Sequence, residues 1–504
     1  MAGGVAAGHP LTAEAAGSLL EAGGNAFDAV LAGLAAACVV EPVLASLGGG
    51  GFLMARRADG EAVLLDFFVQ TPRQAPRAAE LDFHPVTVDF GTAQQEFHIG
   101  MGSIATPGVV RGLFEAHRLL GTVPMPGIVE PAAAYARQGT PLNPLQAYIL
   151  DIVGPIYVST AAARRVYTRS DGRLLQAGDT LRQPELADAL ETLALEGDRL
   201  FYEGEMAAAL ARDCAASGGL LGRDDLRGYQ AVQRRPLAHD YRGSRILTNP
   251  PPSSGGLLIA FAQELLAPHD LGRLGFGSPE HLALLARVMA QTNLARQREP
   301  AGEDLLCSER VARYRRAVAG HPVTARGTTH ISVVDGEGNA AALSLSNGEG
   351  CGYLLPGTGI MVNNMLGEED LNPTGFHCWP TDTRVSSMMA PTLAVSRERL
   401  LAVGSGGSNR LRTAILQVLC NLLDFDMDAA AAVASPRIHF ERGLASIEPG
   451  FDAAAVSALA EQCSRHHIWQ EQNLFFGGAH LVCSEAGRVS GAGDPRRGGV
   501  YRTA

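Results

Sequence analysis

Apolar positions recur at helical spacing over most of the first 300 residues. Residues 12–23 predict a helix that stops at paired glycines, and Asn25 is placed to cap a second helix. This second helix, which includes the run 29–40, is apolar nearly all round, so we expect it to be buried between other elements. Pro42 ends it, and residues 108–240 read mostly as further helices with charged outer faces.

The pattern changes character near residue 328. Alternating apolar residues predict one hairpin from strands 330–335 and 340–346 and a smaller one from strands 353–355 and 360–363. Residues 296–327, just before this change, are polar, arginine-rich and without clear periodicity. We expect that stretch to be exposed and mobile.

The first hairpin brings two hydroxyl side chains together if its turn is centred on Glu337. Antiparallel partners then have residue numbers that sum to 674, so Thr328 lies opposite Ser346 on one face. A two-residue turn would shift the register by one and lose this pairing. An ordinary structural Thr/Ser pair across two strands is the alternative interpretation at this point.

Composition excludes several classes of function. The 504 residues are 46% hydrophobic, carry a net charge of -11, and include 41 basic residues, all of them arginine. Without lysine there is no Schiff-base enzyme and no P-loop. An acidic chain without a basic block argues against nucleic acid or an anionic membrane as a partner and favours a small-molecule substrate.

The cysteines and the apolar runs bear on the compartment. Eight cysteines are scattered singly, without metal-type spacing, so we expect buried thiols, with disulfides as the alternative and no metal site. The longest apolar run is too short for a bilayer, because a span needs about 20 residues. The first residues lack the features of a signal peptide, which predicts a cytoplasmic protein, or a secreted one if a leader has been removed.

The sequence Thr-Thr-His-Ile-Ser-Val-Val-Asp at 328–335 closely resembles the start of the small subunit in gamma-glutamyltransferases, where the first Thr is the nucleophile. Further matches follow in family order along nearly the whole chain. They are Gly8-His9-Pro10, Gly23-Gly24-Asn25-Ala26 with Asp28, Glu41-Pro42, the four-glycine run 48–51 with Phe52, Thr106-Pro107-Gly108, Pro250 to Gly256, Pro356-Gly357-Thr358-Gly359 with Asn363-Asn364, Ser386-Ser387-Met388, Gly406-Gly407 and Asp494-Pro495-Arg496.

The resemblance implies an α+β fold of four αββα layers, the N-terminal-nucleophile hydrolase fold. It also implies self-cleavage between Gly327 and Thr328, which gives a heterodimer of interleaved subunits 1–327 and 328–504. No cofactor is implied. The expected partners are a small-molecule amide and an acceptor, either water or an amino acid or peptide, and a higher oligomer is left open.

Self-cleavage would create the base that a threonine nucleophile lacks. A hydroxyl is a poor nucleophile near neutral pH, but a free α-amino group titrates at about 7.7–8.0 and accepts its proton. Ser346 would orient the Thr328 hydroxyl, and the N–H groups of Gly406 and Gly407, ahead of a predicted helix, would bind the oxyanion. The resemblance adds the pair Ser386-Ser387 as a contact for the substrate carboxylate.

Three departures from the family fall where the glutamyl group would bind. Phe68 stands in place of the arginine that holds the α-carboxylate, and Glu368 is the nearest substitute for the carboxylate that holds the α-amino group. Asn347 is shifted because its loop is shorter than in the family. The reaction machinery is therefore expected to remain while the substrate contacts change.

Two other interpretations are compatible with these departures. One is a non-catalytic, uncleaved relative, although keeping both Thr328 and Ser346 argues against it. The other is an acylase for amides without a free α-carboxylate. A lipase-type Gly-x-Ser-x-Gly elbow is absent from the sequence, and the run 48–51 is weak as a phosphate site because it lacks a dinucleotide-binding context.

Overall fold

Two β-sheets face each other at the centre of the molecule. The computed structural model describes residues 3–75, 81–89, 94–299, 302–315, 328–372 and 375–504. One sheet has the order β22 (Val500–Thr503), β1 (Gly4–Ala7), β11 (Thr329–Val334), β12 (Ala340–Ser346), β2 (Gly50–Arg56), β3 (Ala62–Phe67), β8 (Val232–Arg234). The other has the order β21 (Arg488–Ala492), β20 (Gly478–Glu485), β16 (Arg399–Gly406), β15 (Thr392–Val395), β10 (Ser244–Thr248), β9 (Leu237–Tyr241).

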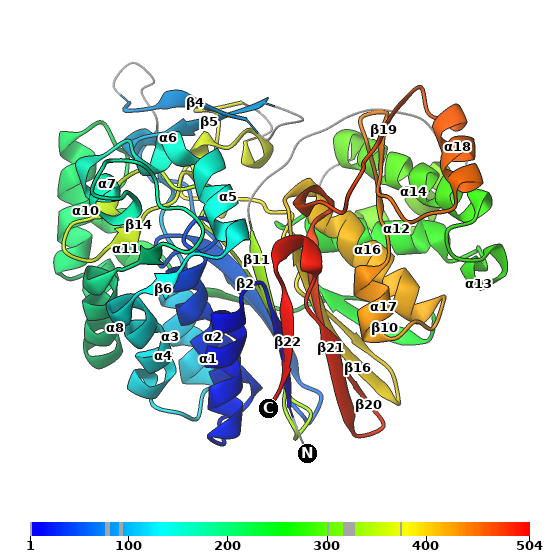
Figure 1. Cartoon of the computed structure of the whole chain (residues 1–504), viewed down its shortest axis with the longest axis horizontal. Helices are drawn as coiled ribbons and strands as arrows, with labels where there is room; N and C mark the ends of the chain where they lie inside the picture. The colour runs from blue at the N-terminus through cyan, green and yellow to red at the C-terminus, as the bar shows by residue number, and fades with distance from the viewer. Residues whose placement is uncertain (1–2, 76–80, 90–93, 300–301, 316–327, 373–374) are drawn as a thin grey trace.

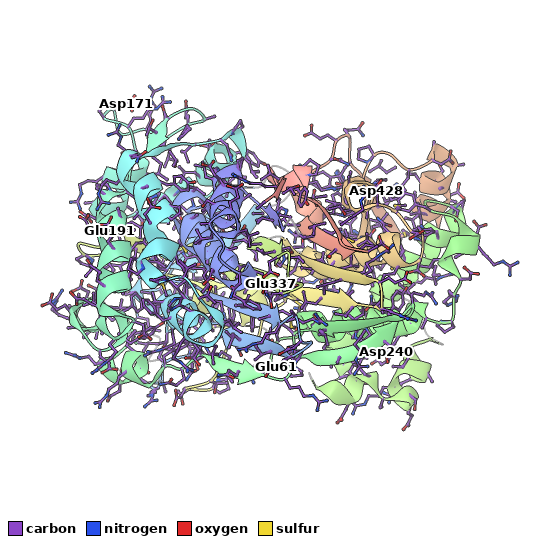
Figure 2. The ribbon with its side chains drawn as sticks, turned by 90° about the horizontal axis from the view of Figure 1, so that it is seen from below. Glu61, Asp171, Glu191, Asp240, Glu337 and Asp428 are labelled. Atoms are coloured by element: carbon purple, nitrogen blue, oxygen red, sulfur yellow. The ribbon has the colours of Figure 1, made fainter. Side chains whose placement is uncertain are left out.

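Helices cover the outer face of each sheet, on the left and right of Figure 1. The first sheet carries α1 (Pro10–Glu21), α2 (Ala26–Val40), α3 (Val109–Leu120), α4 (Met125–Gln138) and α8 (Pro184–Glu196). The second carries α12 (Gly255–Leu266), α14 (Pro279–Arg298), α16 (Asn409–Leu423) and α17 (Ala429–Ala434). In the perpendicular view of Figure 2, Glu337 in the β11–β12 turn lies between Glu191 of the left-hand helices and Asp428 of the right-hand ones. The predicted αββα layering is confirmed.

Smaller elements surround this core. They are β4 (His84–Asp89), β5 (Gln94–Ile99), η2 (Met101–Ser103), β6 (Thr140–Pro141), α5 (Pro144–Ile152), α6 (Gly154–Tyr157), α7 (Ala161–Tyr167), β7 (Thr180–Leu181), α9 (Arg199–Tyr202), α10 (Glu205–Ala216), α11 (Arg223–Gly228), α13 (Leu271–Leu274), η3 (Glu303–Leu306), α15 (Ser308–Arg315), β13 (Leu354–Leu355), β14 (Ile360–Met361), η4 (Met365–Gly367), η5 (Glu369–Leu371), β17 (Ile438–Glu441), β18 (Leu444–Ile447), α18 (Ala453–Gln462), β19 (Arg465–Ile468), η6 (Leu474–Phe476) and η7 (Pro495–Arg497).

Helix α2 shows how the sequence pattern becomes a layer. Its N-cap Asn25 accepts hydrogen bonds from the backbone N–H groups of Phe27 and Asp28, and the Asp28 carboxylate accepts one from the Asn25 N–H. Every residue of α2 is buried. The helix packs against α1, α4 and strand β11, which explains an apolar surface on all sides.

The segments before and after residue 328 are interleaved. Strands β1, β2, β3 and β8 share a sheet with β11, β12 and β22, and β9 and β10 share the other with β15, β16, β20 and β21. The described ends of the chain also meet, because Gly3 and Ala504 exchange backbone hydrogen bonds of 2.6 and 3.0 Å. Neither segment forms either of the two large sheets by itself, so a cut at residue 328 would leave one globule.

The structure corrects the expectation for residues 296–327. Helix α14 continues to Arg298, and α15 forms over Ser308–Arg315, so much of the described part of this stretch is helical. Its polar residues lie at the ends of helices that bury their apolar faces, which masked the periodicity. Residues 316–327, including Gly327, lie outside the described part of the chain.

The cysteine expectation holds for most of the thiols. All eight are free, and five are buried, whereas Cys307 and Cys378 are exposed and Cys463 is half-buried. Among the described helices, none combines the length and apolar character required for a membrane span.

Candidate functional site

The hairpin β11–β12 has the register that places Thr328 opposite Ser346. Thr329 pairs with Leu345 and His330 with Ser344, so partner numbers sum to 674 as predicted. Thr328 immediately precedes β11 and is 5% exposed, and Ser346 ends β12 at 8% exposed. Opposed side chains in such a pair have Cβ atoms about 4.5–5.5 Å apart, which brings two hydroxyls within reach of each other.

The four-glycine run at 48–51 packs backbone against backbone beside this hairpin. Strand β2 pairs with β12, with Gly50 opposite Ser346. A Cβ on Gly49 would lie 2.4 Å from the Ser346 carbonyl oxygen, and one on Gly51 would lie 2.6 Å from the Ser344 carbonyl oxygen. Glycine is therefore required for close approach of the strands, and the run serves the nucleophile hairpin.

The loop 406–408, which carries the predicted oxyanion donors Gly406 and Gly407 and is called the donor loop below, lies against the Thr328 backbone. Gly406 ends β16, and a Cβ there would lie 2.0 Å from the Thr328 carbonyl oxygen. Gly407 has φ of +116°, which favours glycine, and α16 begins two residues later at Asn409. The two glycines thus lie beside Thr328 at the positive end of a 15-residue helix, where an oxyanion is favoured.

Ser405 anchors this loop through its hydroxyl. Its Oγ donates to the Gly406 carbonyl oxygen at 2.7 Å and accepts from the Gly478 N–H at 3.0 Å. Three residues later, Ser408 has φ of +51°, a conformation that costs a non-glycine residue about 1–3 kcal/mol. The loop therefore combines a serine anchor with a strained residue at the start of α16.

A cavity of about 210 Å³ opens beside Thr328. Six predicted site residues line it, and eight further residues complete its wall. The predicted six are Thr328, Ser346, Phe68, Glu368, Ser386 and Ser387; the others are Ser254, Arg296, Asp370, Leu371, Met388, Met389, Ser408 and Leu411. A larger surface hollow of about 880 Å³, around Asn25 and Asp335, contains none of the predicted site residues.

The turn before α12 braces the predicted serine pair. The N–H groups of Ser254 and Gly255 both donate to the Ser387 carbonyl oxygen, and the Ser386 hydroxyl donates to the Pro252 carbonyl oxygen at 2.8 Å. Ser386 is exposed and Ser387 is buried. The segment from Pro250 to Gly256, one of the family matches, thus fixes one wall of the cavity.

Phe68 forms the apolar wall where the family has arginine. It is 1% exposed and stacks on Phe52 with ring centroids 5.4 Å apart. The nearby Arg384 does not line the cavity: its guanidinium donates to the Phe68 and Gln230 carbonyl oxygens and lies over the Tyr229 ring. That guanidinium is held behind the backbone of Phe68.

Arg296 is one of the lining residues that the sequence did not predict. It comes from the last turn of α14, in the stretch expected to be exposed. Its Nη1 donates to Asn409 Oδ1 at 3.2 Å and lies 3.6 Å from Glu441 Oε1. Arg73 and Arg410 do not line the cavity: Arg73 pairs with Asp382 at the surface, and Arg410 donates to the Phe475 carbonyl oxygen.

Glu368 and Asn347 differ in their relation to the cavity. Glu368 is 5% exposed and lines the cavity. Asn347 is fully buried and is not among the lining residues, and neither polar atom of its amide has a hydrogen-bond partner in the described structure. Ser346 lines the cavity, and Asn347 directly follows it at the end of β12, where successive side chains point to opposite faces.

Two ionisable residues, Glu41 and Arg497, are buried near the start of β11. Glu41 accepts hydrogen bonds from the Thr12 and Thr329 hydroxyls at 2.8 and 2.7 Å, and burial raises the pKa of its carboxyl. Burial lowers the pKa of Arg497 to about 10, although the charges of Asp494, Glu349 and Glu41 oppose this shift. Thr329 therefore fastens the start of β11 to the first segment of the chain through Glu41.

Comparisons with known proteins agree with this geometry. The family model described as gamma-glutamyltranspeptidase matches residues 12–504. The chain is 31% identical to the acylase ACY 1 proenzyme of a Pseudomonas species, over 97% of this chain and 91% of that protein. It is 30% identical to the glutathione hydrolase proenzyme of Escherichia coli, over 95% and 87% of the two chains.

Solved structures show the same fold. The cephalosporin acylase from Bacillus halodurans superposes with a TM-score of 0.87 at 23% identity, covering 100% of this chain and 95% of that one. The gamma-glutamyltranspeptidase of Helicobacter pylori matches over 61% of this chain and 86% of that one, with a TM-score of 0.53 and 28% identity. The chain therefore belongs to the gamma-glutamyltranspeptidase family and is an N-terminal-nucleophile hydrolase or acyltransferase that acts on gamma-glutamyl or other acyl amides.

Proposed function

We propose that this enzyme is an acylase for amides whose acyl group carries no free α-carboxylate. The observation that carries the proposal is Phe68, which lines the cavity and stacks on Phe52 in place of a carboxylate-binding arginine. An ionised carboxylate against the Phe68 ring would lose hydration without gaining the charged partner that an arginine provides, at a cost of several kcal/mol. The acylase names of two relatives support this choice.

The reaction begins with maturation at the Gly327–Thr328 bond, which frees the Thr328 α-amino group. This amine takes the proton from Thr328 Oγ as the oxygen attacks the amide carbonyl carbon. The oxyanion is bound by N–H groups of the loop at Gly406 and Gly407. The C–N bond then breaks, the amine leaves with the proton, and an acyl ester remains on Thr328.

The second half of the reaction repeats these steps with an acceptor. Water, or an amino acid or peptide amine, loses a proton to the Thr328 α-amino group and attacks the ester carbon. The same donors bind the second oxyanion, and Thr328 Oγ leaves with the proton. The cavity beside Thr328 holds the acyl group in both halves, against Leu371, Met388 and Leu411.

A gamma-glutamyl donor is the second candidate, and the placement of Arg296 and Glu368 favours it. Both side chains line the cavity, so Arg296 could bind the α-carboxylate of a gamma-glutamyl substrate while Glu368 binds its α-ammonium group. Arg296 is already engaged with Asn409 and Glu441, which weakens its attraction for a second anion. This arrangement makes gamma-glutamyl compounds the weaker substrates.

The test compares a gamma-glutamyl anilide with apolar acyl anilides on fully processed enzyme. We expect larger kcat/KM for the apolar compounds, and Arg296→Gln should change kcat/KM for both kinds of compound by a similar factor, because Arg296 also donates to Asn409. Efficient turnover of the gamma-glutamyl compound that Arg296→Gln abolishes selectively would show that the clamp has been rebuilt around Arg296. That result would replace the first candidate with the second.

A further inference from the structure

The donor loop 406–408 has a second anchor on a separate part of the chain. Asp370 belongs to η5, next to the loop that carries Glu368, and lines the cavity. Its Oδ2 accepts from Ser408 Oγ at 3.2 Å and from Asn409 Nδ2 at 3.4 Å. One carboxylate oxygen therefore holds two successive residues at the junction of the donor loop and α16.

The backbone at Ser408 explains why such an anchor is needed. Ser408 is the N-cap of α16, with φ of +51° and ψ of -130°, and its hydroxyl makes no capping bond to the helix. A non-glycine residue stays in this region only when its surroundings hold it there. The bond from its hydroxyl to Asp370 is a contact of this kind, and it takes the place of a helix cap.

Asn409 carries the connection further. It is 1% exposed, its Nδ2 donates to Asp370, and its Oδ1 accepts from Arg296 Nη1. The helix end is thus fastened to η5 on one side and to the last turn of α14 on the other. The negative charge of Asp370 also lies at the positive end of α16, where it is favourable.

We infer that Asp370 is a positioning residue that acts through Ser408 and Asn409 to hold the donor loop in the conformation that binds the oxyanion. The inference rests on the proposed function, because it takes the N–H groups of this loop as the oxyanion donors. Asp370 need not touch the reacting atoms. Its loss lets the strained residue relax and moves the donors away from the Thr328 side of the cavity.

The experiment combines kinetics with a double-mutant cycle. We expect Asp370→Ala and Ser408→Ala each to lower kcat by about 10- to 100-fold with KM nearly unchanged, because donor alignment acts on the transition state. The double variant should lose no more than Asp370→Ala alone, since Ser408→Ala breaks one of the two bonds that Asp370→Ala removes. Asp370→Asn keeps an acceptor oxygen and should recover most of the activity. Glu369→Ala, an exposed neighbour outside the cavity wall, is the matched control.

Hydrogen exchange provides a readout that does not depend on the substrate. Amides of residues 404–411 should exchange faster in Asp370→Ala than in the parent enzyme, with the rest of β16 unchanged. A raised KM with unchanged kcat, additive losses in the double variant, or unchanged exchange would overturn the inference. If the parent enzyme turns over no acyl anilide, the proposed function fails while the exchange measurement still decides the role of Asp370.

Discussion

Ser346→Ala is the sharpest perturbation of the nucleophile hairpin. The register sets Ser346 opposite Thr328, so we expect its hydroxyl to orient the Thr328 oxygen during both maturation and turnover. Ser346 Oγ also accepts from the Gly348 N–H at 3.1 Å, within a buried loop. One substitution therefore removes a positioning contact and a local structural bond.

The two effects have separate magnitudes. Leaving the buried Gly348 N–H without its partner costs about 1–3 kcal/mol of folding stability. Misplacing the nucleophile costs about 10²-fold in rate, which equals about 2.7 kcal/mol in the activation barrier. We expect Ser346→Ala to show both, as a lower unfolding midpoint and as slower self-cleavage and turnover.

Ser344 supplies the matched control. It lies two residues earlier on the same face of β12, is fully buried, and its hydroxyl is 2.8 Å from His330 Nδ1. Ser344→Ala should lower stability by a comparable amount and leave kcat within a few-fold. The assays are band intensities on a denaturing gel over time, kcat with an acyl anilide, and thermal unfolding. Normal processing and turnover in Ser346→Ala, or equal kinetic losses in both variants, would refute the reasoning.

Three further variants test the surroundings of the nucleophile. Thr328→Ala should remain a single chain of about the full 52.9 kDa on a denaturing gel, and a small fragment of the parent enzyme that begins elsewhere than Thr328 would contradict the mechanism. Thr329→Val should lower stability by about 1–3 kcal/mol because Glu41 loses a donor, whereas Thr329→Ser should not, as unfolding midpoints will show. Burial raises the pKa of Glu41, so its contribution to stability is present below its ordinary value of 4.5 and is lost as pH rises through the folded pKa. Glu41→Gln should therefore flatten the fall in stability as the pH rises above the ordinary carboxyl value of 4.5 in thermal scans.

The local parts of the site could be predicted because local chemistry determines them. The turn centred on Glu337 sets the register of β11 and β12, and the cap at Asn25 sets the start of α2. The donor loop follows from a strand, two glycines and a helix in sequence order. Each of these inferences needs only residues that are neighbours along the chain.

The rest of the cavity depends on contacts between distant segments. Arg296 reaches the cavity because the last turn of α14 lies beside the start of α16, where Arg296 donates to Asn409. The helical spacing of Leu282, Leu285 and Met289 predicts a helix in this region. No local pattern shows that Arg296 points toward the cavity. The Asp370 anchor joins η5 to a loop 38 residues later. Tertiary placement decides both, so the sequence alone left them out.

The structure also explains why the reaction and the selectivity of this enzyme can change separately. Ser346 and Gly406 are fixed by backbone pairing within their sheets, and Thr328 directly precedes strand β11. A Cβ on Gly406 would collide with the Thr328 carbonyl oxygen. Phe68 and Arg296 instead reach the cavity with side chains, from the residue after β3 and the last turn of α14. Substitution at these positions alters the wall without moving a strand. The departures at Phe68 and Glu368 therefore fall on the cavity wall, because that is where side chains can change while the nucleophile and its donors stay in place.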